Sequence, residues 1–276
     1  MTKSTLPFTL GIIIIAIIGI IFQIPFDKVI TESHFSNFQI EYLVLSVKMS
    51  SIFFLSLILI NNLKEKALSG LDSSYKWSFK FINLIPFYLF LLGISTFIDK
   101  DLSLVEINNL LLLLLACLMV GFAEEYIFRG FLQPLFIKKY ISHKNGIFLG
   151  ILFPALFFGS SHLLNLTVND NIPQVIGQSI YAVFIGFFFG VVLLKTNKLI
   201  PLAITHGLIN FFFLFNSLPN LNSTTDINSE TRIEATLTEQ ITISIIPLFI
   251  FLPLFIIGLI LLRKINKEQI QEKINL

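Results

Sequence analysis

The sequence contains few charged residues. Only 13% of its 276 residues are Asp, Glu, Lys or Arg, whereas a soluble domain carries about 25%. Because 55% of the residues are hydrophobic, too little polar surface exists to cover a soluble globule. The same composition excludes a disordered or collagen-like chain. The sequence therefore predicts an all-α, polytopic membrane protein.

Cysteine and internal repeats are also scarce. The single cysteine, Cys117, lies inside an apolar run, so an intrachain disulfide is excluded. No internal repeat is evident, which argues against the inverted-repeat transporter folds. The net charge of +2 gives no reason to expect a nucleic-acid partner, because basic residues are also what a membrane protein places in its cytoplasmic loops.

Eight segments are apolar and long enough to cross a bilayer. They cover residues 7–26, 42–62, 81–98, 105–127, 146–166, 173–194, 199–216 and 242–262. No small-residue cleavage site follows the first segment, so we interpret it as a retained span. The chain then divides into three spans (1–104), a motif-bearing core of spans four to seven (105–216), and an external loop, last span and basic tail (217–276).

The basic residues are unevenly distributed over the connecting loops. When alternate loops are assigned to opposite sides, fifteen of the 19 Lys and Arg residues fall on one side. The positive-inside rule then predicts a multi-pass protein of the cell membrane with both termini in the cytoplasm. It also predicts that the polar connection Asn216–Gln240 is external.

Six ionisable side chains lie within or at the ends of these spans, where each costs about 2.5–3.5 kcal/mol to insert. Such residues indicate function unless a structural role explains them. For Lys48 we favour a structural role, in which the ammonium group snorkels to the membrane surface or pairs with a carboxylate. The six are Lys48, Glu124, Glu125, Arg129, His162 and His206.

Two adjacent glutamates end the apolar run of the fourth span. On a helix Glu125 and Arg129 are four residues apart and share a face, so they can form an ion pair. Glu124 points about 100° away from that face, so its carboxylate is available for a different role. An ordinary interfacial ion pair at a helix end is the alternative interpretation.

Two histidines on other spans accompany these glutamates, and together they form a constellation of intramembrane polar residues. Phe158 and His162 share one face of the fifth span, and His206 and Asn210 share one face of the seventh. A lone histidine on an apolar helix is usually a packed core residue, but these occur together with intramembrane carboxylates. A carboxylate that takes a proton from water, with imidazole and amide donors, suits hydrolysis. A Gly-x-Ser-x-Gly nucleophile elbow and a His-Glu-x-x-His zinc motif are both absent.

At these residues the sequence resembles the CPBP family of intramembrane proteases, which groups type II CAAX prenyl proteases with bacteriocin-processing and immunity-associated (Abi) proteins. The family pattern is Glu-Glu-x-x-x-Arg, then Phe-x-x-x-His, then His-x-x-x-Asn/Asp. All three motifs occur here in that order, on three different spans, over about residues 105–216. They are Glu124–Arg129, Phe158–His162 and His206–Asn210.

The resemblance implies peptide-bond hydrolysis within the membrane, with a hydrophobic peptide or a membrane-associated protein as substrate. Glu124 and His162 would activate water, while His206 and Asn210 would stabilise the oxyanion. The remaining motif residues, Glu125, Arg129 and Phe158, would support the geometry of the site. No cofactor is certain. We favour a glutamate-dependent mechanism without metal, and zinc held by Glu124, His162 and His206 remains the alternative.

A catalytically silent scaffold or bacteriocin-immunity protein of the same fold, which binds a partner, is the second functional hypothesis.

The positions of the motif residues along their helices pose a further question. Sixteen residues from Gly146 place His162 about 24 Å along its helix, at the far side of the membrane from Glu124 as the spans are drawn. The residues meet if the fourth span continues past Arg129 towards Pro134 or Lys138, or if the fifth tilts or breaks near Pro154.

Overall fold

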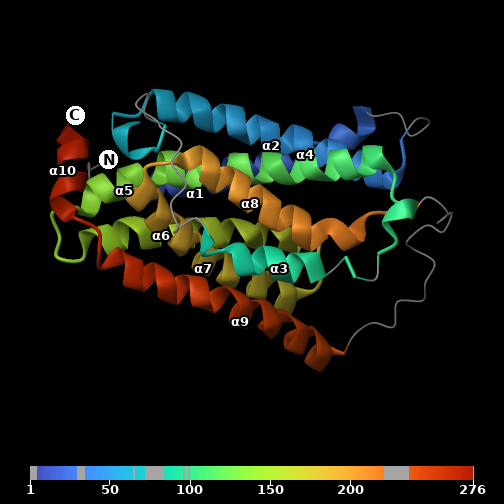
Figure 1. The fold of residues 1–276 in the computed structure, drawn as a ribbon. Helices are drawn as coiled ribbons and strands as arrows, with labels where there is room; N and C mark the ends of the chain where they lie inside the picture. Colours follow the sequence, from blue (N-terminus) through green and yellow to red (C-terminus); the bar gives the residue numbers. More distant parts are fainter. Residues whose placement is uncertain are drawn as a thin grey trace.

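The computed structural model describes residues 5–29, 35–64, 66–71, 84–95, 97–98, 100–220 and 236–275. These residues form an all-α bundle (Figure 1), and their one β contact is an isolated bridge between Val105 and Asn220. The α-helices are α1 (Leu6–Gln23), α2 (Asn37–Asn61), α3 (Phe87–Ser95), α4 (Ile107–Glu124), α5 (Gln133–Tyr140), α6 (Gly146–Ser161), α7 (Ile172–Thr196), α8 (Leu199–Leu214), α9 (Leu237–Leu262) and α10 (Lys267–Asn275).

Seven helical segments in the described part of the chain are long and apolar enough to cross a membrane. The protein is therefore a polytopic membrane bundle, as its composition predicts. The seven correspond to all the predicted spans except the third, at 81–98. Part of that span lies outside the described residues, and its described portion contains α3, a helix of nine residues.

The ends of α2 and α4 show how the chain runs between them. Their first turns lie side by side, because Gln39 donates a hydrogen bond to the side chain of Asn109 at 2.9 Å. The far end of α2 leads into the short helix η2 (Lys66–Leu68), which packs against α10. The chain between α2 and α4, which includes α3, therefore crosses the bundle once more, in agreement with a count of about eight.

Local sequence signals determine several helix ends. Ser36 and Gln39 form a capping box that begins α2. At the start of α7, the side chain of Asn171 accepts a hydrogen bond from the backbone N–H of Gln174. At its other end, α7 stops at Asn197, whose left-handed backbone (φ 54°) makes the tight turn into α8.

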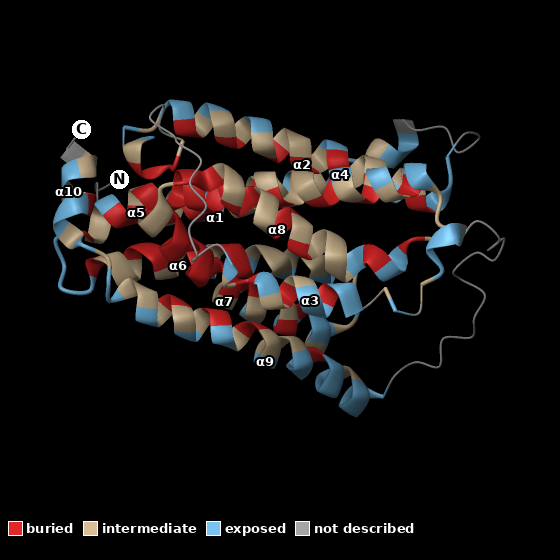
Figure 2. Ribbon diagram, in the orientation of Figure 1, coloured by how far each residue is buried: buried red, intermediate tan, exposed pale blue. Residues whose placement is uncertain are grey.

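The helices form two packed groups that one long element connects. α8 packs mainly against α4 and α3, whereas α7 packs mainly against α6 and α9. The element consists of α4, the π-helix η5 (Glu125–Leu132) and α5, and it leaves the first group to pack against α6 through α5. Buried residues gather where α5, α6 and α7 meet, while α9 carries mostly intermediate and exposed residues (Figure 2).

This long element corrects the predicted boundary of the fourth span. The span does not end at residue 127 but runs from Ile107 to Tyr140, over 34 residues. The helix continues because Glu125 and Arg129 are paired inside the bundle and do not mark its surface. The fifth span is unbroken at Pro154. The structure therefore contains one of the geometries that the sequence left open, the continuation of the fourth span, and it shows no break near Pro154.

The basic tail forms a helix that packs on the bundle. In α10, Ile270 is buried in a cluster with Leu68 and Ile137, and Lys267 donates to the carbonyl oxygen of His143 at 3.1 Å. α10 and the start of α1 lie at the same end of the molecule (Figure 1). Most of the predicted external loop, Asn216–Gln240, lies outside the described residues.

Candidate active site

The candidate site surrounds the π-helix η5. Each of its eight residues, Glu125–Leu132, is buried, although the segment contains a carboxylate and a guanidinium. π-helical turns are rare and occur frequently at functional sites. The segment lies in the middle of the long element, where α4 gives way to α5.

An ion pair lies at the centre of the site. Arg129 Nη1 is 3.1 Å from Glu125 Oε1, and the two side chains are 1% and 0% exposed. The guanidinium carbon also lies over the ring of Phe158, 4.2 Å from its centroid, in a cation–π arrangement. The pair that the four-residue spacing predicts is therefore present and fully buried.

His206 contacts both glutamates with its two ring nitrogens. Nδ1 is 2.8 Å from Glu125 Oε1, and Nε2 is 3.5 Å from Glu124 Oε2. Adjacent helical residues point in different directions, but the imidazole lies across both side chains and so reaches each of them. Arg129, Glu125, His206 and Glu124 thus form one continuous polar chain inside the bundle.

The ring of Phe158 joins this chain to the second histidine. Its centroid is 5.0 Å from that of His162 and 6.0 Å from that of His206, and both contacts are edge-to-face. His162 begins the short 3-10 helix η6 (His162–Thr167), directly after α6. Six of the seven predicted site residues are therefore brought together by these contacts: Glu124, Glu125, Arg129, Phe158, His162 and His206.

Asn210 is the seventh. It lies one helical turn beyond His206 on α8 and is partly buried, and its side chain forms no hydrogen bond with another described residue. Lys48 lies outside the constellation, because its ammonium group donates to the carbonyl oxygen of Phe22 at 2.8 Å. Its partner is thus a backbone carbonyl and not the carboxylate that the sequence suggested.

Glycines permit the close approach of the helices that carry the site. A Cβ atom on Gly121 of α4 would lie 2.6 Å from the backbone nitrogen of Gly207 on α8, so these two helices cross with backbones in contact. A Cβ on Gly186 of α7 would lie 2.7 Å from Arg129 Nη2 and 3.0 Å from Phe158. Small residues at such crossings are typical of membrane helices.

These glycines were missed from the sequence. The signal that could have found them is the pair Gly186 and Gly190, four residues apart in an apolar helix, which is the small-residue spacing of membrane helix interfaces. Gly190 receives the side chain of Gln133, whose amide donates to the Gly190 carbonyl at 3.0 Å. The two glycines thus accommodate the buried polar side chains at positions 129 and 133.

The donors for a metal ion do not converge in the described part of the chain. No group of three or more His, Cys, Asp or Glu side chains lies there in an arrangement that could hold a metal. The two nitrogens of His206 face Glu124 and Glu125. We therefore derive no step through zinc.

One comparison with known proteins found a match in the region of this site. Residues 106–212 match the family model described as Type II CAAX prenyl endopeptidase Rce1-like. This segment is Rce1-like. It contains all three motifs, so the match confirms the family resemblance that they indicated. No curated protein and no solved structure matches the chain.

The Rce1-like segment and the helical bundle together give a coarse description of function. The protein is a multi-pass membrane protein with a segment that is similar to CAAX protease-like peptidases. A membrane-associated peptide substrate is the general class that this family implies.

Proposed function

We propose that the protein is an intramembrane endopeptidase that cleaves a hydrophobic peptide or membrane-associated protein by glutamate-activated water. The observation that carries the proposal is the contact of His206 with both Glu124 and Glu125 at the end of α4, inside a bundle of apolar helices. A buried chain of this composition is costly to keep in a membrane. Proton transfer and charge stabilisation are the chemical uses that explain it.

Glu124 is the proposed general base. Its side chain is 15% exposed, whereas that of Glu125 is completely buried, so Glu124 is the carboxylate that a water molecule reaches. Glu125 is already engaged by Arg129 and by His206 Nδ1. In the proposed step Glu124 accepts a proton from water while the water oxygen attacks the peptide carbonyl carbon. His162 orients the same water.

His206 and Asn210 are the proposed oxyanion donors. Glu125 accepts from Nδ1 and thereby fixes the orientation of the imidazole, which points Nε2 towards Glu124. In the imidazolium form, Nε2–H donates to the oxygen that becomes negative in the tetrahedral intermediate. The Asn210 amide supplies the second donor from the next turn of α8. As the carbon–nitrogen bond breaks, the proton held by Glu124 passes to the nitrogen of the leaving amine, and this transfer restores the Glu124 carboxylate.

The loss of one oxyanion donor has a defined kinetic signature. Asn210→Ala should lower kcat by about 10²–10³-fold with little change in KM, because the amide acts on the transition state. Steady-state kinetics on one cleaved peptide measures both constants. An increase in KM at unchanged kcat would show instead that Asn210 binds the substrate in its ground state.

The experiment that tests the proposed activity uses purified protein in lipid nanodiscs with a quenched fluorescent peptide library. We expect hydrolysis by the wild type and none by Glu124→Ala. Elemental analysis of the active protein distinguishes the metal-free mechanism from a zinc mechanism. Zinc at one equivalent per chain, with activity lost to chelators and restored by zinc, would contradict the metal-free version. Binding of peptide without hydrolysis would favour the silent-scaffold hypothesis.

We also propose that the protein resides in the cell membrane with both termini in the cytoplasm. The uneven distribution of basic residues supports this orientation. In a Cys117→Ala background, a membrane-impermeant thiol reagent added to intact cells should label Val168→Cys, a residue that is 86% exposed, and should spare Lys267→Cys. The opposite labelling pattern would reverse the orientation.

A further inference from the structure

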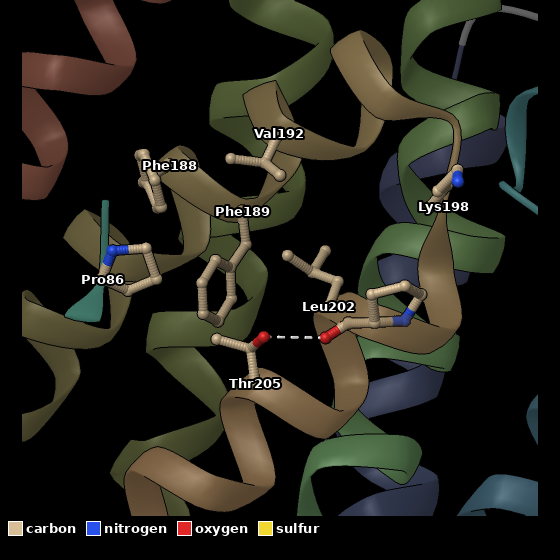
Figure 3. Close-up of a pocket in the computed structure, with 8 residues that line it drawn as sticks. Pro86, Phe188, Phe189, Val192, Lys198, Leu202 and Thr205 are labelled. Carbon is tan, nitrogen blue, oxygen red and sulfur yellow. Dashed lines mark hydrogen bonds between the residues drawn. The ribbon is translucent and has the colours of Figure 1, made fainter. Parts of the chain in front are cut away.

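A small pocket lies between α7, α8 and the residues that lead into α3. It lies close to the candidate site, because the ring centroid of Phe189, which lines it, is 5.7 Å from that of His206, and Thr205 directly precedes His206 on α8. Figure 3 shows the lining side chains arranged around the space. They are Pro86, Phe188, Phe189, Val192, Lys198, Pro201, Leu202 and Thr205.

The lining near the site is apolar and offers no unused hydrogen-bond donor. Phe189, Val192 and Leu202 are buried hydrophobic side chains. The one hydroxyl there, Thr205 Oγ1, donates to the carbonyl oxygen of Pro201 at 2.8 Å (Figure 3). A hydrogen-bond acceptor that entered this end of the pocket would lose its hydrogen bonds to water without replacement, which is unfavourable. The lining therefore selects an apolar occupant.

The size of the pocket limits that occupant. Its cavity volume is about 10 Å³, which is close to the lower limit for a single water molecule. A methyl group is of similar size to water. A branched side chain would meet the rings of Phe188 and Phe189 or the side chain of Leu202. These residues are packed in the hydrophobic core and have little freedom to move aside.

From this geometry we infer that the pocket between α7 and α8 is a specificity subsite, which takes a methyl-sized apolar side chain of the substrate next to the cleaved peptide bond. The inference rests on the proposed peptidase function. Phe189 lines the pocket and also contacts the imidazole of His206, and Leu202 forms the wall that excludes longer side chains. Alanine is the residue that fits best.

The test is a side-chain scan of a peptide that the wild type cleaves, with the cleaved bond located by mass spectrometry. Each position beside that bond is replaced in turn by Gly, Ala, Ser, Val and Leu. At one position we expect kcat/KM for Ala to exceed that for Val and Leu by at least about 10-fold, since one methylene in an apolar pocket is worth about 10–200-fold. Ser, which is similar in size to Ala but polar, should also be disfavoured.

Leu202→Ala enlarges the pocket without touching the catalytic residues. It should reverse the preference at that one position, so that Leu becomes a better substrate than Ala by about 10-fold. Val192→Ala, on the facing helix, should shift the preference in the same direction and serves if Leu202→Ala does not fold. The matched control is Ile180→Ala, a residue of α7 that is 40% exposed and lies outside the pocket. It should leave the wild-type preference unchanged.

The outcomes separate this inference from the activity on which it rests. If the wild type cleaves peptides but both enlarged variants keep its side-chain preference at every position, the subsite assignment is wrong. A uniform change in rate over all side chains would indicate a packing gap or a lipid-filled space, and would also contradict it. If the wild type cleaves no peptide, the proposed function itself fails.

Discussion

The π-helix η5 and helix α9 are opposite in composition and in burial. All eight residues of η5 are buried, and they include Glu125 and Arg129. α9 is a helix of 26 residues, of which only Ser244, Phe251, Leu254 and Gly258 are buried. The bundle therefore encloses η5, the more polar of the two segments, whereas the more apolar α9 faces outward.

This difference shows what hydropathy measures in a membrane protein. Apolar side chains gain little by leaving lipid for the protein interior, because lipid tails are as apolar as leucine. Ionisable side chains, in contrast, are excluded from lipid and lie inside the bundle with partners. The lipid-facing helices are thus the easiest to recognise from sequence, and the interior residues that carry chemistry interrupt the apolar pattern.

The largest expected difference between the two segments concerns the buried ion pair. Glu125→Ala and Arg129→Ala should each destabilise the protein by about 3–5 kcal/mol, because each leaves a buried charge without its partner. Unfolding in mixed detergent micelles, with the double variant included, measures the free energies. The double variant should lose less stability than the sum of the two single variants.

The matched control lies in α9. Phe249 is 70% exposed, and Phe249→Ala should change the free energy of unfolding by less than about 0.5 kcal/mol. Additive losses at Glu125 and Arg129 would show that the two charges do not interact. A loss at Phe249 as large as theirs would remove the contrast between the enclosed and the lipid-facing segment.

A smaller effect is expected for Gly186→Ala. The new methyl group would lie 2.7 Å from Arg129 Nη2 and 3.0 Å from Phe158, and such overpacking typically costs about 1–3 kcal/mol. Peptide hydrolysis should fall as well, because Phe158 contacts both histidines. Thermal unfolding and kcat together measure the two effects.

Gly19→Ala is the control for this substitution. Its Cβ would lie 3.4 Å from the side chain of Leu164, which is ordinary van der Waals contact, and it would meet neither Arg129 nor Phe158. We expect little change in stability or rate. If Gly186→Ala behaved in the same way, the packing of α7 against Arg129 and Phe158 would not be required for the site.

Much of the fold and most of the site members could be predicted from the sequence. Apolar length alone identified seven spans that the structure describes as long helices, because spanning a bilayer requires such runs. The cost of burying charge in lipid singled out Glu124, His162 and His206 before any contact was known. Their grouping also followed from three short motifs on separate helices.

The remaining features depend on tertiary packing. The continuation of the fourth span to Tyr140 was not predictable from apolar length, since Arg129 and Gln133 interrupt the run and are tolerated only because α7 encloses them. The contact of one imidazole with two adjacent carboxylates requires the π-helical end of α4 and the close crossing with α8. Neither feature has a signature in composition or spacing.

Glu124→Gln tests the central claim most directly. The substitution keeps the volume of the side chain and its ability to hydrogen-bond to His206, but the amide cannot accept a proton from water. We expect kcat to fall by about 10²–10⁴-fold, while peptide binding by fluorescence anisotropy and the thermal unfolding temperature stay at the wild-type values. Hydrolysis at the wild-type rate by Glu124→Gln would contradict glutamate-activated water as the mechanism.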